Sequence, residues 1–232
     1  AAIADKSQIF QLITAMNRDG SWQWGLWDRS GRLRGLEGIP AEMVEPLLTE
    51  APCLRQGEPL LYTEPLSRAG TVYLFGAGHV GKALVPILAM TDFQVVICDA
   101  RPHAANRELF PQAAKVKCLA YEDAFSHLPP VTEKDYIVIM TPGHQADFEV
   151  LRQALATPAR YIGCIGSRRK VAATREKLLA VGIPAEEIDR VWSPIGLDIG
   201  GDTPAEIAVS VAAQLIACRS GHLEERGQRH GG

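Results

Sequence analysis

The sequence lacks the features that would place it in several large classes of protein. No apolar run reaches the roughly 18 residues that cross a bilayer, and the first residues lack the basic, apolar and small-residue order of a signal peptide. The formal net charge is only −3, and the basic residues are dispersed apart from one cluster. We therefore expect a cytoplasmic protein with no nucleic-acid or membrane partner.

Paired cysteines are also missing. The five cysteines are widely spaced, odd in number and form no CxxC pair, which argues against a disulfide framework and against a zinc or other metal site. Cys98 and Cys164 lie in apolar runs, where a buried thiol usually acts as a small hydrophobic residue. Cys164 also lies close to the end of a predicted strand that borders the expected cleft.

The length and composition are those of a globular protein with two domains. The 232 residues are 47% hydrophobic and 22% charged. We predict a small α+β domain over residues 1–70, a Rossmann-type domain over residues 71–219 and a loose tail over residues 220–232, with the boundary in Ser67–Gly70. In the first domain the pattern predicts helices at Ile3–Met16 and Ala41–Leu48, strands at Ser21–Asp28 and Glu58–Glu64, and a turn at Asp28–Gly31.

Three tryptophans in the first domain allow two interpretations. Trp22, Trp24 and Trp27 alternate with other residues, as in a half-buried strand or a base-stacking platform. Because no basic residues are interleaved with them, we expect a packed hairpin.

The second domain is organised around Val72–Arg101. An apolar run ends at Phe75 and is followed by glycines at the GxGxxG spacing, Gly76, Gly78 and Gly81. A helical segment and a second apolar run follow, and the run ends at Asp99. This is the complete βαβ dinucleotide-binding pattern, in which the glycines allow a tight turn, the approach of a pyrophosphate and helix–strand packing. The free N–H groups of the helix start attract an anion.

Three side chains in this unit have open roles. Asp99, 18 residues after Gly81, is placed to bind a ribose diol. His79 is either a packing residue of the turn or a contact to phosphate or a proton acceptor. Arg101 is either a surface residue or a contact to an anionic group of the ligand.

Strands and helices continue to alternate, which predicts a doubly wound parallel sheet with its ligand at the carboxyl ends of the strands. The predicted segments are short strands at Ala114–Cys118, Asp135–Met140 and Arg160–Ile165, helices at Glu122–His127, Gln145–Ala156, Ser167–Val181 and Ala205–Cys218, and a loop with a helix at Arg101–Phe110.

Polar residues follow two of these strands. His144 and Asp147 lie one turn apart at a helix start, either as capping residues or in ligand binding or proton transfer. The cluster Ser167-Arg168-Arg169-Lys170 starts another helix, where cations oppose the helix dipole. It is either a solvated basic face or, as we prefer, a phosphate site with Ser167 as N-cap.

A glycine-rich loop, Ser193–Glu206, precedes the last helix. Thr203 and Glu206 match a capping box with Pro204 at the first helical position. The residues around Asp198, Gly200 and Thr203 favour a close approach of the backbone to a ligand or partner.

These stretches together resemble the C-terminal domain of the XdhC/CoxI family, the accessory proteins of xanthine dehydrogenase and related molybdenum hydroxylases. The matching segments are FGAGHVG (Phe75–Gly81), CDAR (Cys98–Arg101), GHQAD (Gly143–Asp147), YIGCIGSRRK (Tyr161–Lys170) and SPIGLDIGGDTPAEIAVS (Ser193–Ser210). The resemblance covers roughly two thirds of the chain. The sequence differs from the family at two points. Residues 1–70 contain no GSSPR-like or GGC-type motif, and Pro142 stands where an arginine is common.

The resemblance implies binding of the molybdenum cofactor, molybdopterin, its sulfuration and its delivery to an apo-molybdenum hydroxylase. It also implies a homodimer and a sulfurtransferase as a further partner. His144 and Asp147 would face the ligand, the glycine turn and basic cluster would hold its anionic groups, and the loop at Asp198 would close the cleft. An NAD(P)-dependent oxidoreductase and a regulatory nucleotide-binding protein remain alternatives; no Lys/Tyr pair or catalytic domain that would support a free-standing dehydrogenase is evident.

Overall fold

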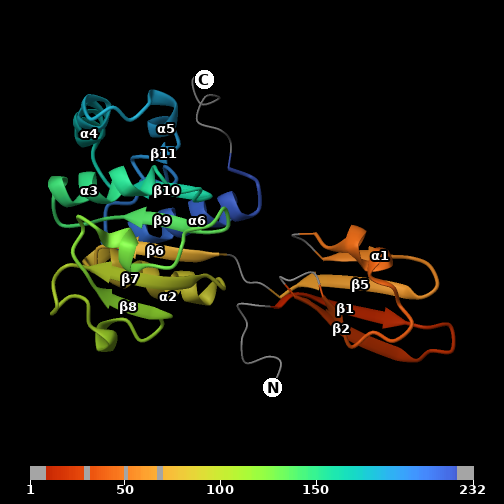
Figure 1. The fold of residues 1–232 in the computed structure, drawn as a ribbon. Helices are drawn as coiled ribbons and strands as arrows, with labels where there is room; N and C mark the ends of the chain where they lie inside the picture. Colours follow the sequence, from red (N-terminus) through yellow and green to blue (C-terminus); the bar gives the residue numbers. More distant parts are fainter. Residues whose placement is uncertain (1–8, 29–31, 50–51, 67–69, 224–232) are drawn as a thin grey trace. The chain divides into compact units, whose positions relative to one another are not determined.

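The computed structural model describes residues 9–28, 32–49, 52–66 and 70–223, without the side chains of Ile9, Phe10, Asp28, Pro65 and Arg168. The chain divides into two compact units, Ala1–Arg68 and Ala69–Gly232 (Figure 1). The predicted turn at Asp28–Gly31 and boundary at Ser67–Gly70 lie mostly outside the described residues, as does most of the predicted C-terminal tail.

The first unit is a five-stranded antiparallel sheet in the order β3-β2-β1-β5-β4. Helix α1 and the 3₁₀ helix η1 pack against one face of the sheet, where the side chains of Ile13, Val44, Leu61 and their neighbours form a core. The elements are β1 (Ile9–Met16), β2 (Trp22–Asp28), β3 (Leu33–Arg34), α1 (Ala41–Val44), η1 (Glu45–Leu47), β4 (Cys53–Arg55) and β5 (Leu60–Pro65).

The helix predicted at Ile3–Met16 is wrong for the residues that the structure describes. Residues 9–16 form β1, which pairs with β2 on one side and β5 on the other. Gln11, Ile13 and Ala15 are buried, which is the two-residue period of a strand. Leu12, Ile13 and Met16 also fit a helical spacing, so the sequence pattern favoured a helix. Pairing with strands on both sides outweighs this local preference.

The strand predicted at Ser21–Asp28 is confirmed as β2, which forms a hairpin with β1, but its tryptophans are divided between two environments. Trp27 is packed in the core with 8% of its surface exposed, whereas Trp22 and Trp24 are 62% and 63% exposed. The expectation of a fully packed hairpin therefore holds only for Trp27.

The second unit is a six-stranded parallel sheet in the order β11-β10-β9-β6-β7-β8, the Rossmann arrangement predicted from the alternating pattern. Its strands are β6 (Thr71–Phe75), β7 (Gln94–Asp99), β8 (Lys115–Cys118), β9 (Tyr136–Ile139), β10 (Tyr161–Cys164) and β11 (Val191–Trp192). Its helices are α2 (His79–Met90), α3 (His144–Ala154), α4 (Arg168–Ala180), α5 (Ala185–Asp189) and α6 (Pro204–Arg219), with 3₁₀ turns η2 (Arg107–Leu109) and η3 (Ala124–His127).

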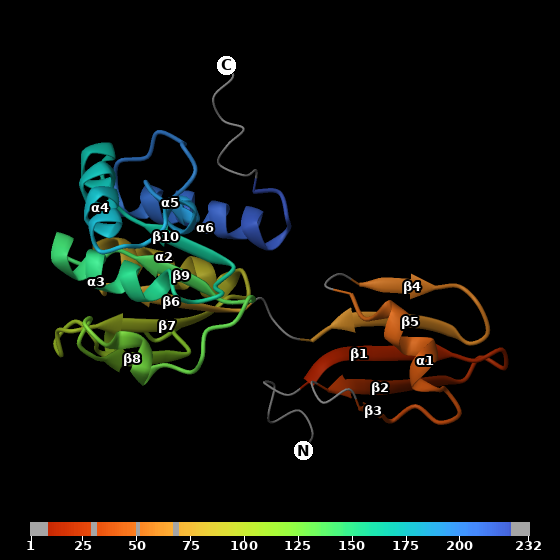
Figure 2. The same cartoon turned by 45° about the horizontal axis from the view of Figure 1, so that its top comes forward.

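Helices cover both faces of this sheet (Figure 2). Alternate strand residues, such as Leu74 and Phe75, belong to two different cores. One core contains α2 and α6, and the other contains α3, α4 and α5. Strands buried on both faces are continuous apolar runs, which is why β6 and β9 were predictable from the sequence. Within the described residues no helix is long and apolar enough to cross a membrane.

The chain reverses direction across the sheet between β6 and β9. The connections after β6 lead outward to β7 and β8, while β9 begins the opposite half on the other side of β6. In open parallel sheets ligands bind in the crevice at the carboxyl ends of the strands where this reversal occurs. The loops that follow β6 and β9 are therefore the first places to look for a site.

Candidate ligand site at the carboxyl edge of the parallel sheet

Packing within the protein accounts for two of the three glycines in the turn after β6. Gly76 has φ +115°, and a Cβ atom there would lie 2.2 Å from the carbonyl oxygen of Met140, just after β9. A Cβ atom at Gly81 would lie 2.6 Å from the carbonyl oxygen of Gly76. These two glycines are required for the turn to pack against the neighbouring strand and helix.

Gly78 has a different environment. Its φ of −81° suits any residue, and no heavy atom lies within 4 Å of the place of a Cβ atom. It is the N-cap of α2 and supplies no side-chain cap, and the following His79 is exposed. The first N–H groups of α2 thus have no side-chain cap, and the space beside Gly78 is open to a ligand.

Asp99, at the end of β7, is fully buried. Its carboxylate accepts hydrogen bonds from the backbone N–H of Ala77 at 2.7 Å and of Arg101 at 2.9 Å. The guanidinium group of Arg101 donates two more, from Nε at 2.9 Å and Nη2 at 2.8 Å. Burial opposes ionisation of Asp99, but the hydrogen bonds from Arg101 and Ala77 outweigh it and lower the pKa of the carboxyl group. We call Gly76–Gly81 with Asp99 and Arg101 the first corner.

A second corner, Thr141–Asp147 with Lys170, repeats this arrangement after β9. Gly143 is the N-cap of α3, again without a side-chain cap and with nothing within 4 Å of a Cβ position, and it is followed by the exposed His144. Asp147 is fully buried. Its Oδ1 accepts hydrogen bonds from the backbone N–H of Thr141 at 3.1 Å and from its hydroxyl group at 2.5 Å.

Lys170 completes the second corner from α4. Its ammonium group lies 2.5 Å from Oδ2 of Asp147, an oxygen that has no other polar partner among the described residues. Ser167 is the N-cap of α4, as predicted, and accepts from the backbone N–H of Lys170 at 3.4 Å. The side chain of Arg168 lies outside the described residues.

A groove of about 510 Å³ opens beside the second corner. This volume is within the range of small-molecule sites. Its wall is formed by the first turn of α3 and by one side of α4, and it includes four side chains that carry or can carry a positive charge. The lining residues are His144, Ser167, Arg169, Lys170, Ala173, Thr174 and Lys177.

The groove therefore brings together predicted site residues from two helices. Lys177 was missed by the sequence analysis, although its spacing of seven residues from Lys170 places both on one side of α4. Asp147 and Lys170 were both predicted site residues, but their ion pair was not predicted, because they lie 23 residues apart and no spacing rule links them.

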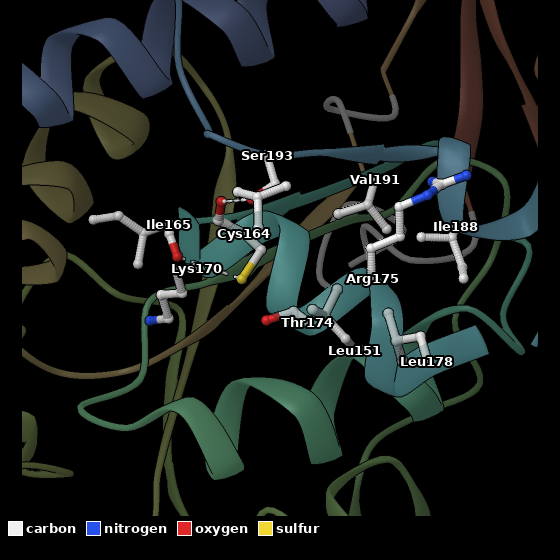
Figure 3. Close-up of a pocket in the computed structure, with 11 residues that line it drawn as sticks. Leu151, Cys164, Ile165, Lys170, Thr174, Arg175, Leu178, Ile188, Val191 and Ser193 are labelled. Atoms are coloured by element: carbon white, nitrogen blue, oxygen red, sulfur yellow. Dashed lines mark hydrogen bonds between the residues drawn. The ribbon is translucent and has the colours of Figure 1, made fainter. Parts of the chain in front are cut away.

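A second, smaller cavity of about 50 Å³ lies behind Lys170, between α4, β10 and β11 (Figure 3). Cys164, Lys170, Thr174, Arg175 and Ser193 line it together with apolar side chains, and this volume holds only a few water molecules. Cys164 is buried, as predicted, and burial together with the charge of Asp147 raises the pKa of its thiol to about 12. The thiol is thus protonated at neutral pH and is a poor nucleophile.

Of the glycine-rich loop before α6, only Ser193 lines the small cavity, and none of its described residues lines the groove. Asp198, Gly200 and Thr203 are exposed. The predicted capping box of Thr203 and Glu206 is present, with Pro204 at the first helical position. Gly196 is explained by packing, since a Cβ atom there would lie 2.3 Å from the hydroxyl oxygen of Ser210.

No group of three or more histidine, cysteine or acidic side chains suited to a metal ion occurs in the part of the chain that the structure describes. The site is suited to binding anions. The N–H groups at the uncapped starts of α2 and α3 lie on either side of the strand reversal, and two cations, Arg101 and Lys170, are held by buried carboxylates.

Comparison with known proteins shows similarity to two relatives over part of the chain. The chain is 34% identical over 146 residues to a Bacillus subtilis protein named as a probable xanthine dehydrogenase subunit, covering 63% of this chain and 42% of that protein. It is 31% identical over 147 residues to YqeB of Escherichia coli, covering 63% of this chain and 27% of that protein. The chain thus spans less than half the length of these two relatives.

A solved structure extends the similarity over both units. A crystal structure described as a xanthine dehydrogenase from Bacillus halodurans superposes with a TM-score of 0.74 at 26% identity, over 97% of this chain and 62% of that one. The family profile described as the XdhC Rossmann domain matches residues 72–215, which include both corners and the basic cluster of α4. Because this match covers more than half of the sequence, the chain belongs to the XdhC family.

Proposed function

We propose that this chain binds the molybdenum cofactor and assists its maturation and insertion into an apo-molybdenum hydroxylase of the xanthine dehydrogenase type. The observation that carries the proposal is the convergence of the segments typical of the XdhC family at one edge of the parallel sheet. The glycine turn contacts the start of the loop after β9, and Asp147 in turn joins that loop to Lys170 on α4. Names of relatives that refer to xanthine dehydrogenase support the choice of client.

The residues present fit a phosphate-bearing cofactor. The uncapped N-terminus of α2 and the open space beside Gly78 would receive the pyranopterin phosphate. Arg169, Lys170 and Lys177 would bind further anionic groups along the groove, with His144 facing the same space from α3. The cofactor itself supplies the molybdenum and dithiolene chemistry that the client enzyme uses.

The two polar residues of the second corner have separate roles in this proposal. His144 is exposed in the groove and would touch the ligand directly. Asp147 is fully buried, so its role is to position Lys170 and Thr141 rather than to transfer protons. The loop from Asp198 through Gly200 to Thr203 would close over the bound cofactor, and a homodimer and a sulfurtransferase partner complete the proposal.

The test is retention of cofactor by the whole chain during ultrafiltration, with molybdenum cofactor released from a molybdoenzyme offered alongside NAD and NADP. We expect the pterin alone to be retained. Arg169→Ala combined with Lys177→Ala should weaken retention about tenfold or more, because both exposed cations line the groove.

Arg152→Ala is the matched control, since this arginine of α3 pairs with Glu149 and does not line the groove. Retention of NAD or NADP without the pterin would contradict the proposal and indicate a nucleotide-binding role. Equal retention by the groove variant and the control would remove the groove from the site.

A further inference from the structure

Asp99 occupies the place where a dinucleotide-binding unit usually binds a ribose diol, but here the carboxylate has no free acceptor position. A carboxylate has about four lone-pair directions. All four are used, by two backbone N–H groups and two donors of Arg101, and none of the side chain is exposed. A diol could reach Asp99 only by displacing Arg101, whose guanidinium group is bound to the buried carboxylate by two hydrogen bonds.

Arg101 presents the outer part of its guanidinium group instead. Its side chain is 38% exposed. Its Nε and Nη2 donate to Asp99, which leaves further N–H donors of the guanidinium group on the outer edge. Because the buried carboxylate of Asp99 binds one edge of the guanidinium group, the group keeps one orientation. Its remaining N–H donors are then available to a ligand beside the glycine turn.

The same place contains a buried hydroxyl group that lacks a well-formed hydrogen bond. Tyr121, after β8, is 7% exposed, and its hydroxyl oxygen makes no hydrogen bond of normal geometry within the described residues, although Asp99 and the backbone of Ala100 lie close enough to interact with it. Burial and the nearby charge of Asp99 raise the pKa of Tyr121, so the hydroxyl keeps its proton and remains a donor. A buried donor without a well-formed hydrogen bond costs stability, and an acceptor atom of a ligand beside Tyr121 would complete its hydrogen bonding.

We propose that Arg101 binds an anionic group of the ligand, above all a phosphate, at the carboxyl end of β7, and that Asp99 is a positioning residue which holds Arg101 and the glycine turn. The site thereby selects a ligand with a phosphate where an NAD-type ligand has a ribose diol. This inference rests on the proposal that a phosphate-bearing ligand occupies the first corner, and it is independent of which such ligand the cell supplies.

The experiment compares two probes that differ in one phosphate: adenosine 2′,5′-bisphosphate and adenosine 5′-monophosphate, titrated calorimetrically into the full chain. If Arg101 binds an anion, the bisphosphate should bind about tenfold more tightly or better, the size of a charge-assisted bidentate contact. A carboxylate free to bind the diol would give the opposite order, because it repels a 2′-phosphate.

The informative variant is the double substitution Asp99→Asn with Arg101→Gln, because Arg101→Ala alone would leave a buried carboxylate unpaired and risk unfolding. The double variant keeps an acceptor for Ala77 and removes both charges. We expect it to bind the two probes within about twofold of each other, whereas Arg152→Ala keeps the wild-type preference.

Equal binding of the probes by the wild type, tighter binding of the monophosphate, or no binding of either would overturn the inference. A preference that persists in the double variant would overturn it as well. Retention of the molybdenum cofactor is measured separately, so a failure of the proposed function is distinguishable from a failure of this subsite.

Discussion

The two corners of the site use the same arrangement with different cations. In each, a helix starts at an uncapped Gly-His pair, Gly78-His79 or Gly143-His144. In each, a fully buried aspartate accepts a hydrogen bond from the backbone of the preceding loop and holds a cation. By contrast, the two other long helices of the unit, α4 and α6, are capped by serine and threonine side chains.

The difference lies in how firmly each cation is held. Arg101 is two residues from Asp99 and binds it through two parallel N–H groups, so its direction is fixed. Lys170 comes from another helix, places one ammonium group on Asp147 and lines both the groove and the small cavity. An ammonium group on a flexible stem adapts to its ligand. If the site binds the proposed ligand, we therefore expect a phosphate in a fixed position at the first corner and an anion in a more variable position at the second.

The largest expected effect comes from removing the buried carboxylates. Asp99→Ala should lower the free energy of unfolding by about 3 kcal/mol, because it removes the acceptor of four hydrogen bonds and leaves the N–H of Ala77 without a partner. Asp147→Ala should cost less, about 2 kcal/mol, because Lys170 can turn toward the groove. Urea unfolding of both variants measures the difference. Equal losses would show that the two cations are held alike, and a larger loss in Asp147→Ala would show that Lys170 is held more firmly than Arg101.

Exchanging the cations should have intermediate effects. Arg101→Lys replaces two directed N–H donors by one ammonium group and should cost about 1.5–3 kcal/mol of stability. Lys170→Arg should stay within about 1 kcal/mol of the wild type, because the lysine borders open space on two sides. Thermal unfolding of the pair tests this; a larger loss in Lys170→Arg than in Arg101→Lys would contradict it.

Acid should weaken the first corner. The folded-state pKa of Asp99 is below its ordinary value of 3.8, so the ion pair contributes stability above that pH and loses it as the pH falls through the lowered pKa. Urea unfolding between about pH 5 and pH 2 should show a steeper loss for the wild type than for the double variant Asp99→Asn, Arg101→Gln. Parallel curves would mean that Asp99 contributes nothing to the acid transition.

Much of the parallel sheet could be predicted, because strands buried on both faces are uninterrupted apolar runs. Val72–Phe75 and Tyr136–Ile139 are such runs, and they lie in β6 and β9. The short elements α5 and β11 were not predicted, since five and two residues carry too little pattern. In the first unit, β1 was mistaken for a helix because its apolar residues satisfy both periods.

The candidate site was predictable in position but not in its internal contacts. That Asp99, His144 and Lys170 lie near strand ends follows from the alternation of strands and helices. That Asp99 is covered by Arg101, and that Asp147 is buried against Lys170, depends on tertiary packing. The sequence pattern placed Asp99 where a diol usually binds and left the role of Arg101 open. Only the structure shows that Arg101 is hydrogen-bonded to Asp99.

The smallest expected change in stability tests the uncapped helix starts. Gly78→Ser or Gly143→Ser would place a hydroxyl group where it can accept from the first N–H groups of α2 or α3, and nothing within 4 Å opposes a Cβ atom at either position. Each substitution should therefore raise the free energy of unfolding by a few tenths of a kcal/mol, roughly the difference between serine and glycine at an N-cap. The same hydroxyl group competes with a bound anion for those donors.

Cofactor retention by the same two variants shows which helix start faces the ligand. If the phosphate lies over the glycine turn, Gly78→Ser should weaken cofactor retention about tenfold while the protein becomes slightly more stable, and Gly143→Ser should weaken it less, because the cations of the groove remain. The reverse order would move the phosphate to the second corner. Because stability and binding change in opposite directions, a loss of retention in a stabilised variant cannot be attributed to unfolding, and it assigns the open N–H groups to the ligand.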